Sequence, residues 1–146
     1  MLRLVLGAVF VSHGMLKLWP EFAGPAETTA LLTSLGFKLP HLVAFALGAV
    51  ELVGGVVLAV GAYTGWAAIA LLQTTVVMSW KLHVSNGRIL NWATDPAGVH
   101  GAEFDLVLAG ALLCLLVTGA GHLSFDRVRR HAADREAAGL ARLKRG

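Results

Sequence analysis

Four apolar stretches of bilayer-spanning length constrain this chain more than any other feature. They cover about residues 2–19, 42–60, 66–83 and 102–119, and each is close to the roughly 20 residues that a transmembrane helix needs. Hydrophobic residues make up 56% of the chain and charged residues 14%, whereas a soluble domain carries about a quarter charged residues. The sequence therefore predicts an integral membrane protein and excludes a water-soluble enzyme domain and a disordered chain.

The first stretch is expected to be kept as a helix and not removed as a signal peptide. His13 and Lys17 interrupt its apolar run, and no small-x-small cleavage site follows it. The single cysteine, Cys114, excludes an intramolecular disulfide, a C-x-x-C thiol relay and a cysteine zinc cluster. With Gly110 and Thr118 it forms a stripe of small residues, which predicts a helix-packing face.

Short connections between the stretches predict an all-α membrane protein, built as an antiparallel four-transmembrane-helix bundle. The first loop should contain a short helix between Pro25 and Gly36, because proline favours the first turn of a helix and glycine its end. Its leucines share one side, so this helix is expected to lie in the membrane interface. We assign residues 1–125 to the four-helix domain.

The remaining residues, 126–146, form a basic tail with seven of the twelve Lys and Arg residues of the chain. The positive-inside rule places this tail in the cytoplasm of a bacterial-type plasma (inner) membrane, with a helix expected over residues 131–144. Four spans then place both termini on the cytoplasmic side and the loops 20–40 and 84–101 outside. The tail is expected to touch anionic lipid heads, and no nucleic-acid partner is predicted.

Ionisable residues inside the predicted spans gather in the outer half of the bundle. Estimated at about 1.5 Å of rise per residue, that half receives residues from all four spans: His13, Lys17, Glu51, Lys81, His83, Glu103 and Asp105. Lysines at C-terminal helix ends and acids at an N-terminal end also suit the helix dipole, and lysines reach the interface on long stems. A purely structural explanation therefore stays open for Lys17, Lys81, Glu103 and Asp105.

Glu51 does not fit that explanation, because it lies about 13 Å below the outer end of its span. An ionised acid at such a depth costs roughly 2.5–3.5 kcal/mol, so Glu51 should be protonated or face a partner. His13 is nearest in depth, although Lys17 or Lys81 could also reach down. We expect Glu51 and His13 to line a polar cavity, with Lys17 on the face of His13. The alternative is a buried pair that only joins two helices.

No metal centre and no tightly bound cofactor are predicted. A haem or metal held by His13 and His83 is disfavoured, because these two histidines lie at different estimated depths. The sequence also has no glycine-rich phosphate loop, nucleophile elbow or metal-protease spacing.

Five short motifs, in order and at matching spacing, resemble the DoxX family of small four-span membrane proteins. They are Ser12-His-Gly-Met-Leu-Lys17, Glu51-Leu-Val-Gly-Gly55, Lys81-Leu-His-Val-Ser-Asn-Gly87, Gly101-Ala-Glu103 and Leu123-Ser-Phe-Asp126. In this resemblance the family's His-Gly and Lys positions fall on His13, Gly14 and Lys17. Its acidic position falls on Glu51 and its histidine before the outer loop on His83.

The resemblance implies a link to quinones, because the family includes subunits associated with quinol oxidase and thiosulfate:quinone oxidoreductase complexes; other members are associated with oxidative or electrophile stress. In the first hypothesis, a quinone headgroup accepts hydrogen bonds from His13 and Lys17, while Glu51 relays a proton. Further ligand-binding candidates are Lys81, His83 and Glu103. The electron carrier would belong to a partner.

Two other hypotheses stay open. The chain could be a non-catalytic accessory subunit of a larger respiratory or photosynthetic membrane complex, or pair with a second copy. A small-molecule exporter comes third, because four short spans leave little room for alternating access.

Overall fold

The computed structural model describes residues 1–22, 24–84, 102–121, 124–129, 131–133 and 135. Five α-helices make up most of this part of the chain: α1 (Leu2–Leu18), α2 (Gly24–Ser34), α3 (Pro40–Val60), α4 (Thr64–Ser79) and α5 (Glu103–Thr118). A 3-10 turn (Pro20–Phe22) follows α1, and a π-helical turn (Trp80–Val84) continues α4. The described residues contain no strand, so the predicted all-α class is confirmed.

The helices lie where the apolar stretches predict them. Helix α3 begins at Pro40. Proline has no backbone N–H, but an N–H in the first turn would have no partner within the helix, so no hydrogen bond is lost. Gly61 ends α3 in the left-handed conformation at φ 75°. Of the described helices, α3 alone meets the length and hydropathy of a membrane span, with 21 residues and a mean hydropathy of 2.3. Helices α1, α4 and α5 have 17, 16 and 16 residues. The four-span topology therefore stays a prediction.

Helices α1 and α3 run antiparallel in close contact because glycines face each other across the pair. A Cβ added to Gly7 would lie 2.8 Å from the carbonyl oxygen of Gly55, and one added to Gly14 would lie 2.7 Å from that of Gly48. Side chains do not tolerate such distances, so the two backbones can approach this closely only at glycine. The two glycines of each helix are seven residues apart and share one face.

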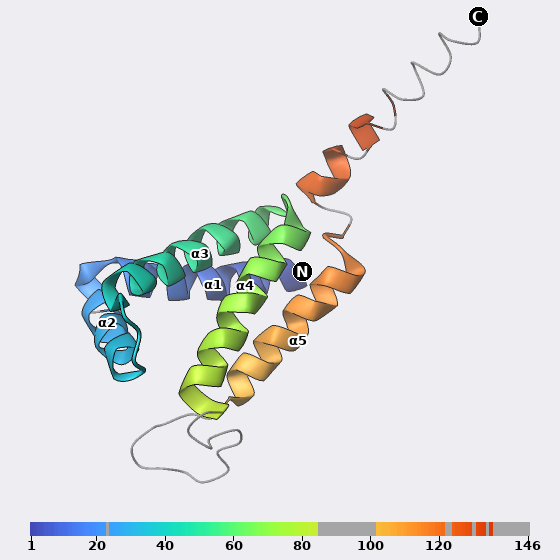
Figure 1. Cartoon of the computed structure of the whole chain (residues 1–146). Helices are drawn as coiled ribbons and strands as arrows, with labels where there is room; N and C mark the ends of the chain where they lie inside the picture. Colours follow the sequence, from blue (N-terminus) through green and yellow to red (C-terminus); the bar gives the residue numbers. More distant parts are fainter. Residues whose placement is uncertain (23, 85–101, 122–123, 130, 134, 136–146) are drawn as a thin grey trace, which may run out of the picture.

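Helices α4 and α5 form a second antiparallel pair, which packs through leucines. The core that joins both pairs includes Phe10, Leu58, Leu71, Leu108 and Leu112. Figure 1 shows the two pairs meeting near the N-terminus and the α3–α4 turn and diverging toward α2 and the far end of α4. The predicted bundle is therefore splayed, and the ends of the four helices do not converge on one point.

Helix α2 confirms the helix predicted in the first loop, and it packs against both α1 and α3. Its first residue, Gly24, abuts the carbonyl oxygen of Leu16 and has no room for a Cβ. Leu32 is fully buried, so this side of α2 contacts protein. Beyond α2, the ring of Phe37 lies 5.8 Å from the Nζ atom of Lys81, across the space between the diverging pairs.

One predicted packing face is wrong. Gly110, Cys114 and Thr118 are exposed, and α5 packs on α4 through Leu108, Leu112 and Leu115 instead. Leucines bury more apolar area than small residues, and that difference decides which side of α5 faces the core. Residues 85–101 of the predicted loop 84–101 lie outside the described residues, as do residues 134 and 136–144 of the predicted tail helix 131–144.

The segment that follows α5 contacts the α3–α4 turn and stabilises it through hydrogen bonds to Asp126. Oδ1 of Asp126 accepts a hydrogen bond from the backbone N–H of Tyr63 (2.7 Å), and Oδ2 accepts one from that of Thr64 (2.9 Å). Asp126 thereby caps α4, whose N-cap residue Tyr63 is left-handed at φ 47° and gives no side-chain cap of its own. Nearby, Nη1 of Arg3 donates to the carbonyl of Ala120 at 2.6 Å. We call this region the turn end.

Replacing Asp126 by alanine should lower the free energy of unfolding by about 1 kcal/mol at neutral pH, the usual contribution of a helix cap. Burial acts to raise the pKa of Asp126, but the hydrogen bonds from Thr64 and Tyr63 and the charge of Arg129 outweigh it and hold the pKa below the ordinary 3.8. The carboxylate's contribution is therefore complete above the unfolded-state pKa and is lost as pH falls through the lower folded-state pKa.

Unfolding in mild detergent, followed from pH 7 to pH 3 for the wild type and Asp126→Ala, measures this contribution. The difference between the two proteins should be constant down to about pH 4 and shrink below it. A difference of the same size at pH 3 would contradict the assignment of Asp126 as a charged cap.

Candidate functional site

The structure pairs Glu51 with Lys17. The Nζ atom of Lys17 donates hydrogen bonds to both carboxylate oxygens of Glu51, Oε1 and Oε2. The Glu51 side chain is 9% exposed and that of Lys17 is 24% exposed. This pair joins α1 to α3 and compensates an acidic charge that would be costly in apolar surroundings.

Glycines next to the pair bring the two side chains together. Gly48 lies one turn before Glu51, and a Cβ added there would lie 3.1 Å from Cβ of Lys17 and 2.8 Å from Cγ of Leu18. The C-terminal end of α1 can therefore lie directly against α3 at this point. Gly14 lies one turn before Lys17 and gives the same close approach from the other helix. In each helix a glycine thus lies one turn from the charged residue and on the same face. The two glycines let the helices approach closely at the point where Lys17 meets Glu51.

His13 takes a different position from the one predicted. Its ring contacts the ring of Phe104 in α5, edge to face, with 5.9 Å between ring centroids. The predicted depths were based only on the rise of the helix backbone per residue. The four-carbon side chain of Lys17 is long enough to reach Glu51 although the Lys17 backbone lies one turn further from it. The expected contact of Glu51 with His13 is therefore corrected to a contact of Glu51 with Lys17, and His13 faces the second helix pair.

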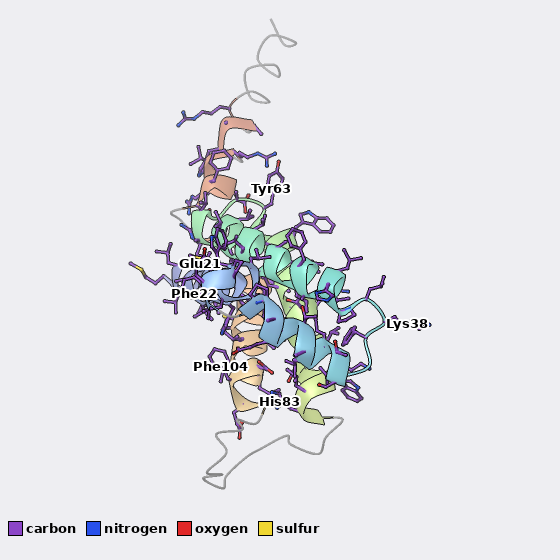
Figure 2. All side chains as sticks on the ribbon, turned by 90° about the vertical axis from the view of Figure 1, so that its left-hand side faces the viewer. Glu21, Phe22, Lys38, Tyr63, His83 and Phe104 are labelled. Carbon is purple, nitrogen blue, oxygen red and sulfur yellow. The ribbon has the colours of Figure 1, made fainter. Side chains whose placement is uncertain are left out.

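His83 and Asp105 form a second polar pair, between the end of α4 and the start of α5. Nε2 of His83 lies 3.5 Å from Oδ2 of Asp105, and Nδ1 of His83 is buried without a hydrogen-bond partner among the described residues. His83 and Lys81 belong to the π-helical turn, a form that is frequent at functional sites. Glu103 begins α5 and is half-buried. Figure 2 shows His83 at the end of the molecule opposite Tyr63.

The seven predicted site residues are thus divided and not gathered in one cavity. Lys17 and Glu51 belong to the α1–α3 pair, and His83 and Asp105 to the α4–α5 pair. The contacts of His13 with Phe104 and of Lys81 with Phe37 connect the two pairs. The splayed arrangement explains this division, because the two helix pairs diverge toward their loop ends.

A cavity of about 250 Å³ lies beside Lys17, between α1, α2 and α3. Its lining includes Lys17, Pro25, Ala26, Thr29, His41 and Phe45. Oγ1 of Thr29 lies 3.5 Å from Nδ1 of His41, so the lining contains two further polar side chains. Glu51 is not part of the lining and acts on the cavity through Lys17.

His41 and Thr29 are not among the site residues predicted from the sequence. A signal for His41 is nevertheless present, because His41, Ala44, Gly48, Glu51 and Gly55 follow one another at alternating spacings of three and four residues. That pattern marks a single helix face. Thr29 carries no comparable signal, since its place depends on how α2 folds back on α3.

The DoxX family model matches residues 1–84, which is more than half of the chain. The chain belongs to the DoxX family. The matched part of this DoxX protein runs from α1 to the π-helical turn and therefore contains Lys17, Glu51 and the cavity beside them.

Two curated proteins are similar over most of their length. The "Putative oxidoreductase CatD" of Bacillus subtilis is 29% identical over 126 residues, which cover 86% of this chain and 82% of that protein. The "Uncharacterized membrane protein Rv3486" of Mycobacterium tuberculosis is 32% identical over 130 residues, which cover 86% of this chain and 77% of that protein. No solved structure matches. The family and the Mycobacterium tuberculosis relative support the conclusion that this DoxX protein is a membrane protein.

Proposed function

We propose that this DoxX-family protein binds the headgroup of a quinone in the cavity beside Lys17 and serves as the quinone-binding component of a membrane oxidoreductase. A relative that is 29% identical is named a putative oxidoreductase. The observation that carries the proposal is that Lys17, a residue with an ammonium group, lines an otherwise largely apolar cavity in a membrane protein. A quinone offers what such a cavity selects: a flat ring with two opposed carbonyl acceptors.

The dimensions of the cavity suit a headgroup and not a complete lipid-tailed molecule. At about 250 Å³ it is smaller than the roughly 300–1,000 Å³ typical of sites for drug-sized ligands. Lys17 would donate to one carbonyl oxygen, while His41, beside Thr29, would meet the other. Phe45 lines the cavity and is exposed, so an isoprenoid tail would leave along it into lipid.

Reduction of a quinone to a quinol takes two electrons and two protons, one proton for each oxygen. In the proposal, Lys17 supplies one proton and His41 the other, and both regain protons from water. Glu51 holds the ammonium group of Lys17 in place by accepting its hydrogen bonds through both carboxylate oxygens. The two electrons come from a flavin, iron–sulfur or haem carrier on a partner protein.

The proposed topology has four spans and both termini in the cytoplasm. The 16-residue α4 runs on through the π-helical turn, which brings its helical length close to that of α3. Loops 20–40 and 84–101 then lie outside, and the cavity beside Lys17 opens at the outer leaflet. The tail with its cluster of basic residues lies inside, as the positive-inside rule requires.

Titration of the purified chain in mild detergent with a benzoquinone that carries a decyl tail tests the binding. Tryptophan fluorescence reports saturation. Ala26→Phe should fill the cavity from its exposed α2 side and weaken binding at least tenfold. Lys17→Gln should weaken it similarly, because a hydrogen bond to a charged donor is worth about 1.5–3 kcal/mol.

Lys38→Gln is the matched control. Lys38 is an exposed lysine in the turn between α2 and α3 (Figure 2) and does not line the cavity, so this variant should bind as the wild type does. Absence of saturable binding to the wild type would contradict the proposal. Unchanged binding to Ala26→Phe would also contradict it, even if Lys17→Gln fails to fold.

An accessory subunit is the second candidate. It is favoured by one observation, namely that Lys17 already donates to both oxygens of Glu51, as expected of a pair that only joins two helices. In that case the quinone titration fails, the chain co-migrates with a larger complex from native membranes, and Glu51→Gln leaves the activity of that complex unchanged.

A further inference from the structure

One side of α4 is not covered by the other described helices. The opposite side, which includes the buried residues Ala68 and Leu71, packs on α3 and α5. The uncovered side carries five exposed residues that follow one another at alternating spacings of three and four: Trp66, Ile69, Gln73, Val76 and Trp80. We call these five residues the α4 stripe.

The α4 stripe has the spacing of a contact between two helices. Trp66, Gln73 and Trp80 are each seven residues apart, and Ile69 and Val76 have the same separation. A repeat of seven residues keeps one narrow line of side chains directed at a neighbouring helix. The stripe therefore fits one further helix that lies alongside α4.

Gln73 lies in the middle of the stripe and of the span proposed for α4. At about 1.5 Å of rise per residue, it lies roughly 13 Å from Thr64, near the centre of the helical run that Thr64–Ser79 and Trp80–Val84 form together. No water is present at that depth to bond the carboxamide, and a polar group left unpaired in hydrocarbon is costly. The side chain is too short to carry the amide to the headgroups.

The neighbouring polar residues are satisfied inside α4, but Gln73 is not. The hydroxyl groups of Thr74 and Thr75 both donate to the carbonyl of Leu71, at 2.9 and 2.8 Å. Within the part of the chain that the structure describes, the Gln73 side chain makes no hydrogen bond. A donor and an acceptor at the centre of the membrane therefore need a partner from elsewhere, and polar side chains in such positions join membrane helices to one another.

We propose that a second copy of this chain packs along the α4 stripe, with the two Gln73 carboxamides hydrogen-bonded to each other. A carboxamide is complementary to itself, because its amide N–H donates to the oxygen of the other copy and its own oxygen accepts in return. Copies of one membrane protein insert with the same topology, so a two-fold axis along the membrane normal brings α4 against α4 in parallel. Each Gln73 then meets its counterpart at equal depth, which favours a second copy over an unrelated span.

The other residues of the stripe suit this arrangement. Ile69 and Val76 are branched and stiff, so they lose little rotamer freedom when they pack. Trp66 and Trp80 stand at the two ends, toward the headgroup levels that tryptophan prefers. Only the centre of the stripe is polar, and one hydrogen-bonded pair there fixes the register of the two helices. The inference rests on the proposed topology but not on quinone binding, since no residue of α4 lines the cavity beside Lys17.

Subunit counting in liposomes tests this dimer. The full-length chain, labelled at its C-terminus, is followed by single-molecule photobleaching as the protein-to-lipid ratio is lowered, and the wild type should pass from two bleaching steps to one. Gln73→Leu keeps the volume but removes the carboxamide, so its dissociation constant should rise about tenfold. Gln73→Asn keeps the carboxamide and should lie closer to the wild type.

Two results of this titration would overturn the proposal. One is a wild type that stays monomeric at every ratio, which would leave the stripe to a span of another protein. The other is a dissociation constant of Gln73→Leu equal to that of the wild type. Gln73→Leu should still bind the decyl benzoquinone, so dimer formation and the proposed function are measured separately.

Cysteine cross-linking places the interface on α4. In a Cys114→Ala background, Val76→Cys puts the single thiol on the stripe, and oxidation with copper phenanthroline in native membranes should give a disulfide-linked dimer. Val107→Cys is the matched control: Val107 and Val76 are 69% and 51% exposed and lie at a similar distance from the turn end, but Val107 belongs to α5. Equal cross-linking at the two positions, or none at Val76→Cys, would overturn the assignment to the α4 stripe.

Discussion

Replacing Glu51 by leucine should lower the free energy of unfolding by about 3–5 kcal/mol, the usual cost of leaving one charge of a buried pair without its partner. Lys17 would keep its ammonium group at the α1–α3 contact with no carboxylate to accept its hydrogen bonds. Part of that cost is recovered wherever Lys17 can turn toward the cavity, since its side chain is 24% exposed. Unfolding of the purified protein in detergent measures the loss.

The double variant Lys17→Met, Glu51→Leu is the control. It removes both charges and leaves side chains of similar volume, and such replacements are often neutral or even stabilising. We therefore expect the double variant to unfold close to the wild type and well above Glu51→Leu alone. If the losses of the two single variants simply add in the double variant, the pair contributes no coupling energy and the assignment is wrong.

The comparison also separates stability from function. Under the proposed function, the double variant should fold but bind the decyl benzoquinone weakly, because the cavity has lost its ammonium donor. Under the accessory-subunit alternative, the double variant should assemble with its partner complex as the wild type does. The double variant, if it folds, can therefore be used to test the function. Glu51→Leu cannot be used in this way if it is too unstable to purify.

The helices could be predicted from the sequence because their boundaries depend on local signals. Apolar runs, Pro40 at the start of α3 and Gly61 at its end place the elements within a few residues. The splay of the two helix pairs could not be predicted, because it depends on which faces pack. Glycines on α1 and α3 allow one close contact, and leucines on α4 and α5 make another with a different geometry.

The candidate site could also be predicted only in part from the sequence. Glu51 was identified from its depth alone, since a buried acid in lipid requires a partner. Its partner was assigned less well, because depth along a helix neglects side-chain length and the direction each side chain takes. His41 was not predicted, and Asp126 was named only as the last residue of a motif, since each gains its role from contact with another segment: His41 with Thr29 of α2, and Asp126 with the α3–α4 turn.

Replacing Gly14 by valine should have the second large effect, because its Cβ would overlap backbone atoms and not the end of a flexible side chain. That Cβ would collide with the backbone N of Leu52 and lie 2.7 Å from the carbonyl oxygen of Gly48. The two helices must separate or shift, at a cost of about 1–3 kcal/mol or more for overpacking. The shift also moves Lys17 away from Glu51, so the loss should exceed that of the clash alone.

Gly110→Ala is the matched control for Gly14→Val and for a milder Gly14→Ala. No atom lies within 4 Å of a Cβ at Gly110, so alanine there should stabilise α5 by roughly 0.5–1 kcal/mol through its higher helix propensity. The same Gly→Ala change should thus have opposite signs at the two positions. Stabilisation by Gly14→Ala as well would mean that α1 and α3 do not approach through their glycines. Destabilisation at Gly14 alone would show that the glycine of the His-Gly-x-x-Lys motif in this DoxX protein is needed for the contact between α1 and α3. The glycine would then set the distance between the helices at which Lys17 reaches Glu51.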